Sequence, residues 1–229
     1  MHQEFDVIVT GSEGYIGSEF VSHLKKKGYE VACVDLKLGH NLRDSKAVDL
    51  LIANMSCSKL ITMHGTNDHF DLVKNTDERI SEVTPEAFTQ ILENNVSTTY
   101  GVCKAFMKTR SSGRIINMSS IYGVVSPRPS LYFPDEKNVA YGVSKSAINQ
   151  LTRHLAVHGA PRFTVNSIVL GGIERNHDLD FTHKYSQGVP MGRMGQIRDV
   201  LPLLETLLFE QSEYLTGTEI TLDGGYTAL

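Results

Sequence analysis

The feature that most constrains the fold of this chain is an alternation of short runs rich in β-branched residues with longer segments of helical periodicity. This alternation is typical of parallel sheets, because a parallel strand needs a crossover connection and a helix supplies it. It predicts an α/β fold with a doubly wound parallel sheet and helices on both faces. The runs that predict strands are Phe5–Thr10, Glu30–Asp35, Lys59–His64, Gly113–Met118, Phe163–Val169 and Thr218–Leu222.

Helices are predicted between these runs, where apolar residues recur at helical spacing. The first carries Ile16, Phe20, Val21 and Leu24, and the lysines before Gly28 favour a helix end there. The other expected helices are Pro85–Lys108, Ser144–His158 and about Asp199–Phe209.

Two long stretches, residues 121–140 and 171–198, lack periodicity. Both follow the carboxyl ends of predicted parallel strands, where open α/β sheets bind their ligands. We therefore expect them to be substrate loops.

Composition limits the classes of partner. The 229 residues carry 22 Lys and Arg against 26 Asp and Glu, and 41% are hydrophobic, which fits one domain over residues 1–229. A net charge of -4 provides no broad positive field for nucleic acid or a membrane surface.

Three cysteines, an odd number, favour reduced thiols. No apolar run approaches the about 18 residues of a membrane span, and Met1–Asp6 lacks a signal-peptide profile, so we expect a cytoplasmic location.

Glycines follow the first predicted strand in Thr10–Gly17, which reads Thr-Gly-Ser-Glu-Gly-Tyr-Ile-Gly. Between a strand and a helix, they allow a tight turn that brings a pyrophosphate close to the helix N-terminus. Asp35 ends the second predicted strand, 24 positions after Gly11, near the spacing of an acid that binds the adenosine ribose. Its charge, with that of Glu13, would repel a 2′-phosphate, so the sequence predicts NAD in preference to NADP.

Tyr141 and Lys145 lie one helical turn apart, so both side chains can face the same cleft. Spacing alone does not identify a site, because Tyr100 and Lys104 share it. Tyr141 follows a strand that ends in two serines, whereas Tyr100 falls inside a predicted helix. We interpret Tyr100 and Lys104 as packing and surface residues.

With these motifs in this order, the chain resembles the short-chain dehydrogenase/reductase family, whose members have a single-domain Rossmann fold. The family transfers a proton and a hydride between a nicotinamide and an alcohol or carbonyl carbon. The segments that carry the resemblance are Thr10–Gly17, Asp35, Asn95–Val96, Ser119–Ser120, Tyr141–Lys145, Val165–Asn166 and Asp223–Gly225.

The resemblance implies a catalytic set. Tyr141 would be the general acid/base, and Lys145 would lower the pKa of its phenol and hold the nicotinamide ribose. Ser120, in preference to Ser119, would hydrogen-bond the reacting oxygen. Asn95 would anchor a water relay to Lys145, with Asn94 as the alternative.

The NAD site implied by the glycine turn and the resemblance extends along the predicted carboxyl edge of the sheet. We expect no metal, because no second ligand stands at a diagnostic spacing from His64. The expected cofactor-binding residues are Gly11, Ser12, Glu13, Gly14, Tyr15, Ile16, Gly17, Asp35, Asn41, Leu42, His64, Gly65, Tyr141, Lys145, Gly171 and Ile173.

Several segments depart from the family pattern. Tyr15 stands where the single-domain branch usually has glycine, and the glycine spacing is like that of the branch that works on sugar nucleotides. Only five residues separate Asp35 from Asn41, too few for the usual crossover helix. The segments Thr62–Gly65 and Leu170–Arg175 are also altered.

The loop before the active-site tyrosine is longer than in most relatives, and we place the insertion in Ser126–Ala140. Its side chains, among them Arg128, Tyr132 and Phe133, are predicted to shape the substrate pocket.

These traits are similar to those of family members in surface-polysaccharide or nonulosonic-sugar pathways. The sequence thus predicts an NAD(H)-dependent oxidoreductase acting on a secondary alcohol or ketone of a sugar or sugar-nucleotide. The resemblance implies a homodimer or homotetramer. Two alternatives stay open: an NAD-binding sensor or pseudoenzyme, and an epimerase or dehydratase that retains its NAD.

Overall fold

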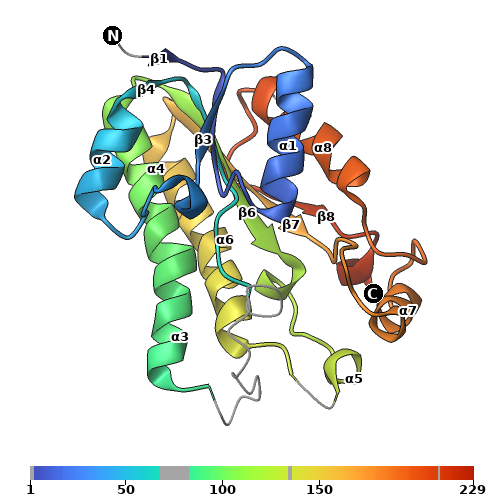
Figure 1. Ribbon diagram of the computed structural model, residues 1–229. Helices are drawn as coiled ribbons and strands as arrows, with labels where there is room; N and C mark the ends of the chain where they lie inside the picture. The colour runs from blue at the N-terminus through green and yellow to red at the C-terminus, as the bar shows by residue number, and fades with distance from the viewer. Residues whose placement is uncertain (1–2, 68–82, 134–135, 211) are drawn as a thin grey trace.

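The computed structural model describes residues 3–67, 83–133, 136–210 and 212–229, and its described part contains one six-stranded parallel sheet (Figure 1). The strand order is β3-β2-β5-β6-β7-β8. The direction of winding therefore reverses between β2 and β5, where doubly wound sheets bind ligands. All six predicted strands are confirmed, as β2 (Val7–Thr10), β3 (Val31–Val34), β5 (Lys59–Thr62), β6 (Gly113–Ser120), β7 (Phe163–Leu170) and β8 (Glu219–Leu222). A short parallel pair, β1 (Gln3–Glu4) and β4 (Met55–Ser56), adds a second sheet.

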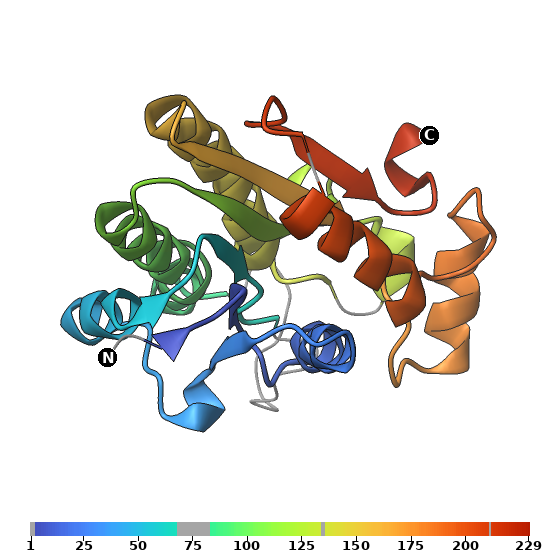
Figure 2. The ribbon, with the colours of Figure 1, turned by 90° about the horizontal axis from the view of Figure 1, so that it is seen from above.

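Helices cover both faces of the sheet, as Figure 2 shows from above. On one face, α2 (Ser45–Ala53), α4 (Thr98–Thr109) and α6 (Val139–Gly159) bury apolar side chains against the strands. On the other face, α1 (Tyr15–Lys26) and α8 (Ile197–Glu205) do the same. The middle strands contain consecutive apolar residues, such as Ile115 and Ile116 of β6, because both of their faces are buried.

The long helix predicted at Pro85–Lys108 is interrupted by one wide turn. It consists of α3 (Pro85–Leu92), the π-helix η2 (Glu93–Ser97) and α4. Thr84 caps the start, with its side chain accepting from the Ala87 N–H. A π-turn within a helix is frequent at functional sites, and this one contains Asn95.

The helix predicted at Ser144–His158 begins earlier than expected, at Val139. The side chain of Asn138 accepts from the Ala140 N–H and so caps the helix. This correction places Tyr141 inside the first turn of α6.

The two expected loops contain short helices that the periodicity did not predict. The first loop holds η3 (Ile121–Gly123) and α5 (Pro129–Tyr132), and the second holds α7 (Leu179–Gln187), which packs against α5 (Figure 1). α2 was also missed. The remaining helical turns are η4 (Thr206–Glu210), which continues α8, and η5 (Tyr226–Ala228).

The expected lack of a crossover helix between Asp35 and Asn41 is confirmed. A single 3-10 turn, η1 (Leu36–Leu38), lies there, and α2 follows it, before β4 and β5. β3 is therefore the edge of the sheet. In the described part of the chain, no helix combines the length and the apolar character needed to cross a bilayer.

Candidate active site

The carboxyl ends of β2, β5, β6 and β7 open into a cavity of about 300 Å³. Most of the predicted site residues line it: Gly11, Gly14, Tyr15, Ile16, Gly17, His64, Gly65, Ser120, Tyr141, Lys145, Gly171 and Ile173. The other predicted residues lie outside this lining: Ser12, Glu13, Asp35, Asn41, Leu42 and Asn95. The cavity thus brings the expected cofactor turn and three of the expected catalytic residues together.

The glycine turn is suited to hold a pyrophosphate. Gly11 has φ +70°, and a Cβ there would lie 2.5 Å from the backbone nitrogen of His64, so only glycine fits. Gly14 precedes α1 without a side-chain cap, which leaves the first N–H groups of the helix free to bind an anion at the cavity. In addition, the buried Ser12 hydroxyl makes no hydrogen bond within the described part of the chain. These features fit a dinucleotide.

Asp35 connects the end of β3 to this turn. Its carboxylate accepts from the Glu13 N–H at 3.0 Å and from the Lys37 N–H at 2.9 Å. Asn41 instead accepts from the Arg43 N–H, and Leu42 packs against the core beneath α2 and α4. Asp35 therefore lies beside the glycine turn as predicted, whereas the structure does not bring Asn41 and Leu42 into the cavity.

Ser120 and Tyr141 meet at the end of β6. Both side chains line the cavity, and Ser120 Oγ accepts from the Tyr122 N–H at 3.2 Å. Ser119 instead donates to the Lys145 carbonyl oxygen at 3.2 Å, which favours Ser120 as the substrate-facing serine. Tyr100 is 49% exposed on α4, in agreement with its interpretation as a surface residue.

Burial dominates the electrostatics of this site. It raises the pKa of Tyr141, and the nearby Ser120 side chain acts in the opposite direction. It also lowers the pKa of Lys145 to about 8. The Lys145 ammonium lies 5.7 Å from the centre of the Tyr141 ring and donates to the Met118 carbonyl oxygen at 3.0 Å. The prediction of a lowered pKa for the Tyr141 phenol is therefore wrong. Its pKa is raised, because burial removes the phenolate from water and so disfavours the charged form.

Asn95 lies outside the cavity lining and bonds residues next to it. Its Oδ1 accepts from the Thr66 N–H at 2.6 Å, and its Nδ2 donates to Ser144 Oγ at 2.9 Å. A Cβ on Gly65 would lie 3.1 Å from Asn95 Oδ1 and 3.8 Å from Lys145 Nζ, so the amide and the ammonium converge there. Asn94 instead accepts from Arg43, which favours Asn95 of the two.

His64 lies in a network of hydroxyl groups. Nδ1 is 2.5 Å from Thr10 Oγ1, and Nε2 is 3.1 Å from Thr98 Oγ1. Burial, with the charge of Lys145, lowers the pKa of His64 to about 4, so the ring is neutral near pH 7. Among the described residues there is no cluster of three side chains able to hold a metal.

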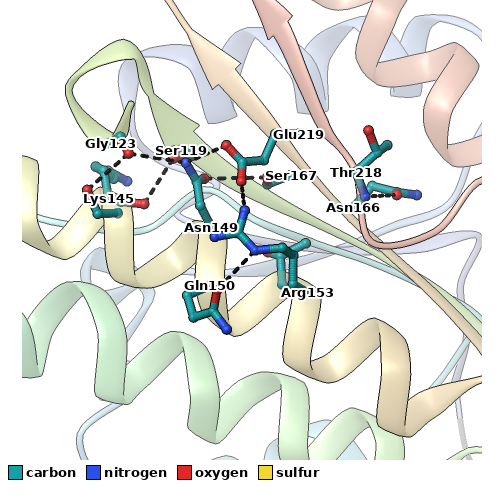
Figure 3. Close-up of polar contacts among 12 residues, drawn as sticks. Ser119, Gly123, Lys145, Asn149, Gln150, Arg153, Asn166, Ser167, Thr218 and Glu219 are labelled. Carbon is teal, nitrogen blue, oxygen red and sulfur yellow. Dashed lines mark hydrogen bonds and ion pairs between the residues drawn. The ribbon is translucent and has the colours of Figure 1, made fainter. Parts of the chain in front are cut away.

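A second polar network, which the sequence analysis missed, fixes α6 to the sheet (Figure 3). The Gly123 carbonyl, just beyond β6, accepts from Ser146 Oγ at 3.0 Å and from Asn149 Nδ2 at 3.5 Å. Asn149 Nδ2 also lies 3.0 Å from Glu219 Oε2 on β8, and Arg153 bonds the same carboxylate. These contacts set the position of the helix that carries Tyr141 and Lys145. No motif marks them, because their donors and acceptors come from separate elements.

The loops supply an aromatic wall. Tyr122 and Tyr132 line the cavity and their hydroxyl oxygens lie 2.7 Å apart. The predicted role of Tyr132 in shaping the pocket agrees with this position. Phe133 is 79% exposed and Arg128 stacks on the Tyr226 ring, so neither lines the main cavity.

The winding of the sheet, the glycine turn and the Ser120–Tyr141–Lys145 set together define the class of dinucleotide-binding oxidoreductases. Comparison with known proteins is consistent with this class. Residues 60–227 match the family model described as Enoyl-(Acyl carrier protein) reductase. The chain therefore belongs to the short-chain dehydrogenase/reductase family, and it is an oxidoreductase.

Individual relatives cover nearly the whole chain. A tropinone reductase homologue of Arabidopsis thaliana is 26% identical, over 96% of this chain and 91% of that protein. A short chain dehydrogenase from Leptospira borgpetersenii serovar Hardjo-bovis with bound NAD+ has a TM-score of 0.85 and 28% identity, covering 98% of this chain and 93% of its own. ElxO with NADP bound shares the fold, with a TM-score of 0.81 and 21% identity over the full length of both chains.

Proposed function

We propose that the protein interconverts a secondary alcohol and a ketone with NAD(H), and that Tyr141 is its general acid/base. The observation that carries the proposal is that Tyr141 and Ser120 line the same cavity as the glycine turn. A phenol and a hydroxyl placed together at the cofactor groove can hold one substrate oxygen between them.

The residues have separate roles in this proposal. When bound, NAD+ would supply the hydride acceptor: the hydrogen of the carbinol C–H bond, with its bonding electron pair, would pass to the nicotinamide, and the alcohol would become a ketone. Tyr141 takes the hydroxyl proton in that direction and returns it in reduction. Ser120 holds the reacting oxygen, Lys145 holds the nicotinamide ribose, and Asn95 anchors a water relay to Lys145.

The preference for NAD over NADP is supported by charge. The Asp35 carboxylate lies beside the glycine turn, where it can accept from ribose hydroxyls and would repel a 2′-phosphate. We propose a sugar or sugar-nucleotide substrate, because the glycine spacing is like that of the branch that uses sugar nucleotides. We also propose a homodimer or homotetramer in the cytoplasm, with Cys33, Cys57 and Cys103 as free thiols.

The test compares Tyr141→Phe with Tyr100→Phe, the matched tyrosine of the other Tyr-x-x-x-Lys pair. A panel of keto-sugars and sugar nucleotides is followed by NADH absorbance, and NADH binding by fluorescence. We expect Tyr141→Phe to abolish turnover with a nearly unchanged Kd for NADH, and Tyr100→Phe to behave as wild type. Retained turnover in Tyr141→Phe would remove the phenol from the mechanism.

A second candidate is an epimerase or dehydratase that retains its NAD. It is favoured by a contact across the groove, because the Tyr15 hydroxyl on the glycine turn donates to the Glu174 carbonyl oxygen at 2.7 Å. Such a contact would slow release of a bound dinucleotide. NAD that stays with the protein through purification, with no net NADH formed during turnover, would support this candidate over the first.

A further inference from the structure

Tyr185 connects the loop of residues 171–198 to the end of β7. It lies in α7, is 3% exposed and lines the cavity. Its hydroxyl oxygen accepts from the N–H of Gly172, two residues beyond β7, at 2.6 Å. A Cβ on Gly172 would lie 2.7 Å from the Tyr185 ring, so the ring packs directly against the backbone of this turn. The contact therefore combines a hydrogen bond with close packing.

The Tyr185 ring is held in a stack of aromatic side chains. Its centre lies 5.4 Å from that of Tyr226 in η5 and 6.1 Å from that of Phe181, one turn earlier in α7. Burial raises the pKa of Tyr185 to about 12, so its hydroxyl is protonated near pH 7. A neutral hydroxyl on a packed, rigid ring is a fixed acceptor for an N–H group.

The turn Gly171–Ile173 borders the reacting part of the site. In the parallel pairing of β6 and β7, Ser120 is opposite Leu170, so the turn begins beside the proposed substrate-facing serine. All three residues of the turn line the cavity, together with Tyr141. Hydride transfer requires the nicotinamide to lie near the carbon that Ser120 and Tyr141 face. The turn is therefore placed to contact the nicotinamide end of the cofactor.

Backbone hydrogen bonds hold the other polar groups of this turn. The Gly171 N–H donates to the Leu222 carbonyl oxygen at 3.0 Å, and the Gly172 carbonyl oxygen accepts from the Gly195 N–H at 2.9 Å. The Gly172 N–H is instead bonded by a side chain. Removing the Tyr185 hydroxyl would take away that acceptor, and a buried N–H that loses its acceptor is costly, so the turn would shift toward another one.

We propose that Tyr185 is a positioning residue, which holds the turn Gly171–Ile173 in the shape that receives the nicotinamide end of the cofactor. The inference rests on the proposed function. Because Tyr185 belongs to α7, the same bond links the placement of the substrate loop to that of the cofactor. The adenosine and pyrophosphate sites are instead formed by Asp35 and the glycine turn, at the ends of β3 and β2. Loss of the bond should therefore weaken binding of the nicotinamide and spare binding of ADP-ribose.

The test compares binding of NADH with binding of ADP-ribose, which lacks the nicotinamide. Both are titrated by calorimetry into wild type, Tyr185→Phe and Tyr226→Phe. Tyr226 is the matched control, because it lies in the same stack, is 4% exposed, and its hydroxyl makes no hydrogen bond within the described part of the chain. We expect Tyr185→Phe to raise the Kd for NADH about fivefold with the Kd for ADP-ribose unchanged. Tyr226→Phe should leave both values unchanged.

Two further measurements separate positioning from a loss of folding. The emission maximum of bound NADH reports the surroundings of the nicotinamide, and it should shift in Tyr185→Phe but not in Tyr226→Phe. The melting temperature shows whether each variant folds. If Tyr185→Phe does not fold, Gly172→Ala provides the same test, because its Cβ would push the turn away from the Tyr185 ring and should give the same selective loss of NADH affinity.

Three outcomes would overturn the inference. The first is a Tyr185→Phe variant that keeps the NADH affinity of wild type, and the second is one that loses affinity for both ligands equally. The third is a Tyr226→Phe variant that loses as much NADH affinity as Tyr185→Phe. Failure of wild type to bind NADH would instead contradict the proposed function, so the two failures are distinguishable.

Discussion

At the residue scale, burial controls the charge of the groups nearest the proposed chemistry. Tyr141, Lys145 and His64 each have a pKa shifted toward the neutral form by desolvation. A neutral phenol suits the role of acid in ketone reduction. In the reverse direction the same burial opposes loss of the proton, and the Ser120 side chain acts against that effect.

His64 makes stability depend on pH. Its pKa is about 4 in the folded chain against 6.5 for the free side chain, so the unfolded chain takes up the proton first as pH falls. The stabilising contribution is complete above pH 6.5 and is lost as pH falls toward 4. We expect the free energy of unfolding in urea to fall by about 2 kcal/mol between pH 7 and pH 5 from this group. His64→Gln should lack this part of the pH dependence, and exposed His183→Gln should keep it; equal slopes in both would contradict the prediction.

Asp35 is the residue on which cofactor preference depends. Removing its carboxylate in Asp35→Ser takes away both the acceptor for the ribose hydroxyls and the repulsion of a 2′-phosphate. We expect the Kd for NADH to rise by about tenfold and NADPH to bind comparably, measured by fluorescence titration. Asp49→Ser is the control, because Asp49 on α2 pairs with Lys108 on α4 at 3.7 Å and does not line the cavity. An unchanged ratio of the two affinities would contradict the assignment.

At the element scale, the start of α6 determines where Tyr141 lies. Asn138 caps this helix only three residues before the phenol. Asn138→Ala should cost about 1 kcal/mol of stability and lower kcat by about tenfold or more, because the first turn loses its fixed position. Asp44→Ala removes the cap of α2, away from the site, and should cost similar stability with kcat unchanged. Urea unfolding measures the change in stability, and steady-state kinetics measures the change in kcat. An equal loss of kcat in both variants would contradict the claim that Asn138 positions Tyr141.

Elements with strong periodicity could be predicted from sequence and short ones could not. The β-branched runs identified every strand of the main sheet, because buried parallel strands need apolar residues on both faces. α2, α5 and α7 were missed because helices of one to three turns contain too few apolar positions to show a period. Their N-caps, such as Asp44 and Asp178, were the available signals.

At the scale of the whole molecule, the order of motifs identified most of the candidate site, and tertiary placement supplied the rest. Ser120, Tyr141 and Lys145 meet as the family resemblance implies. Lys137, which is 9% exposed and lines the cavity, was not predicted, since a lysine in a loop has the sequence signature of a solvated residue and only the fold shows that it is buried. The predicted direction of the pKa shift of Tyr141 was wrong for the same reason, because residue spacing contains no information on desolvation.

The contact between α6 and β8 has a mechanical consequence. The Asn149 side chain bonds both the Gly123 carbonyl, in the turn after Ser120, and Glu219 on the edge strand β8, so it connects that edge of the sheet to the helix that carries Tyr141. If β8 detached from the sheet, α6 would lose this contact, and Tyr141 would move away from Ser120. Loss of turnover and detachment of the rim strand should therefore occur as one event during unfolding.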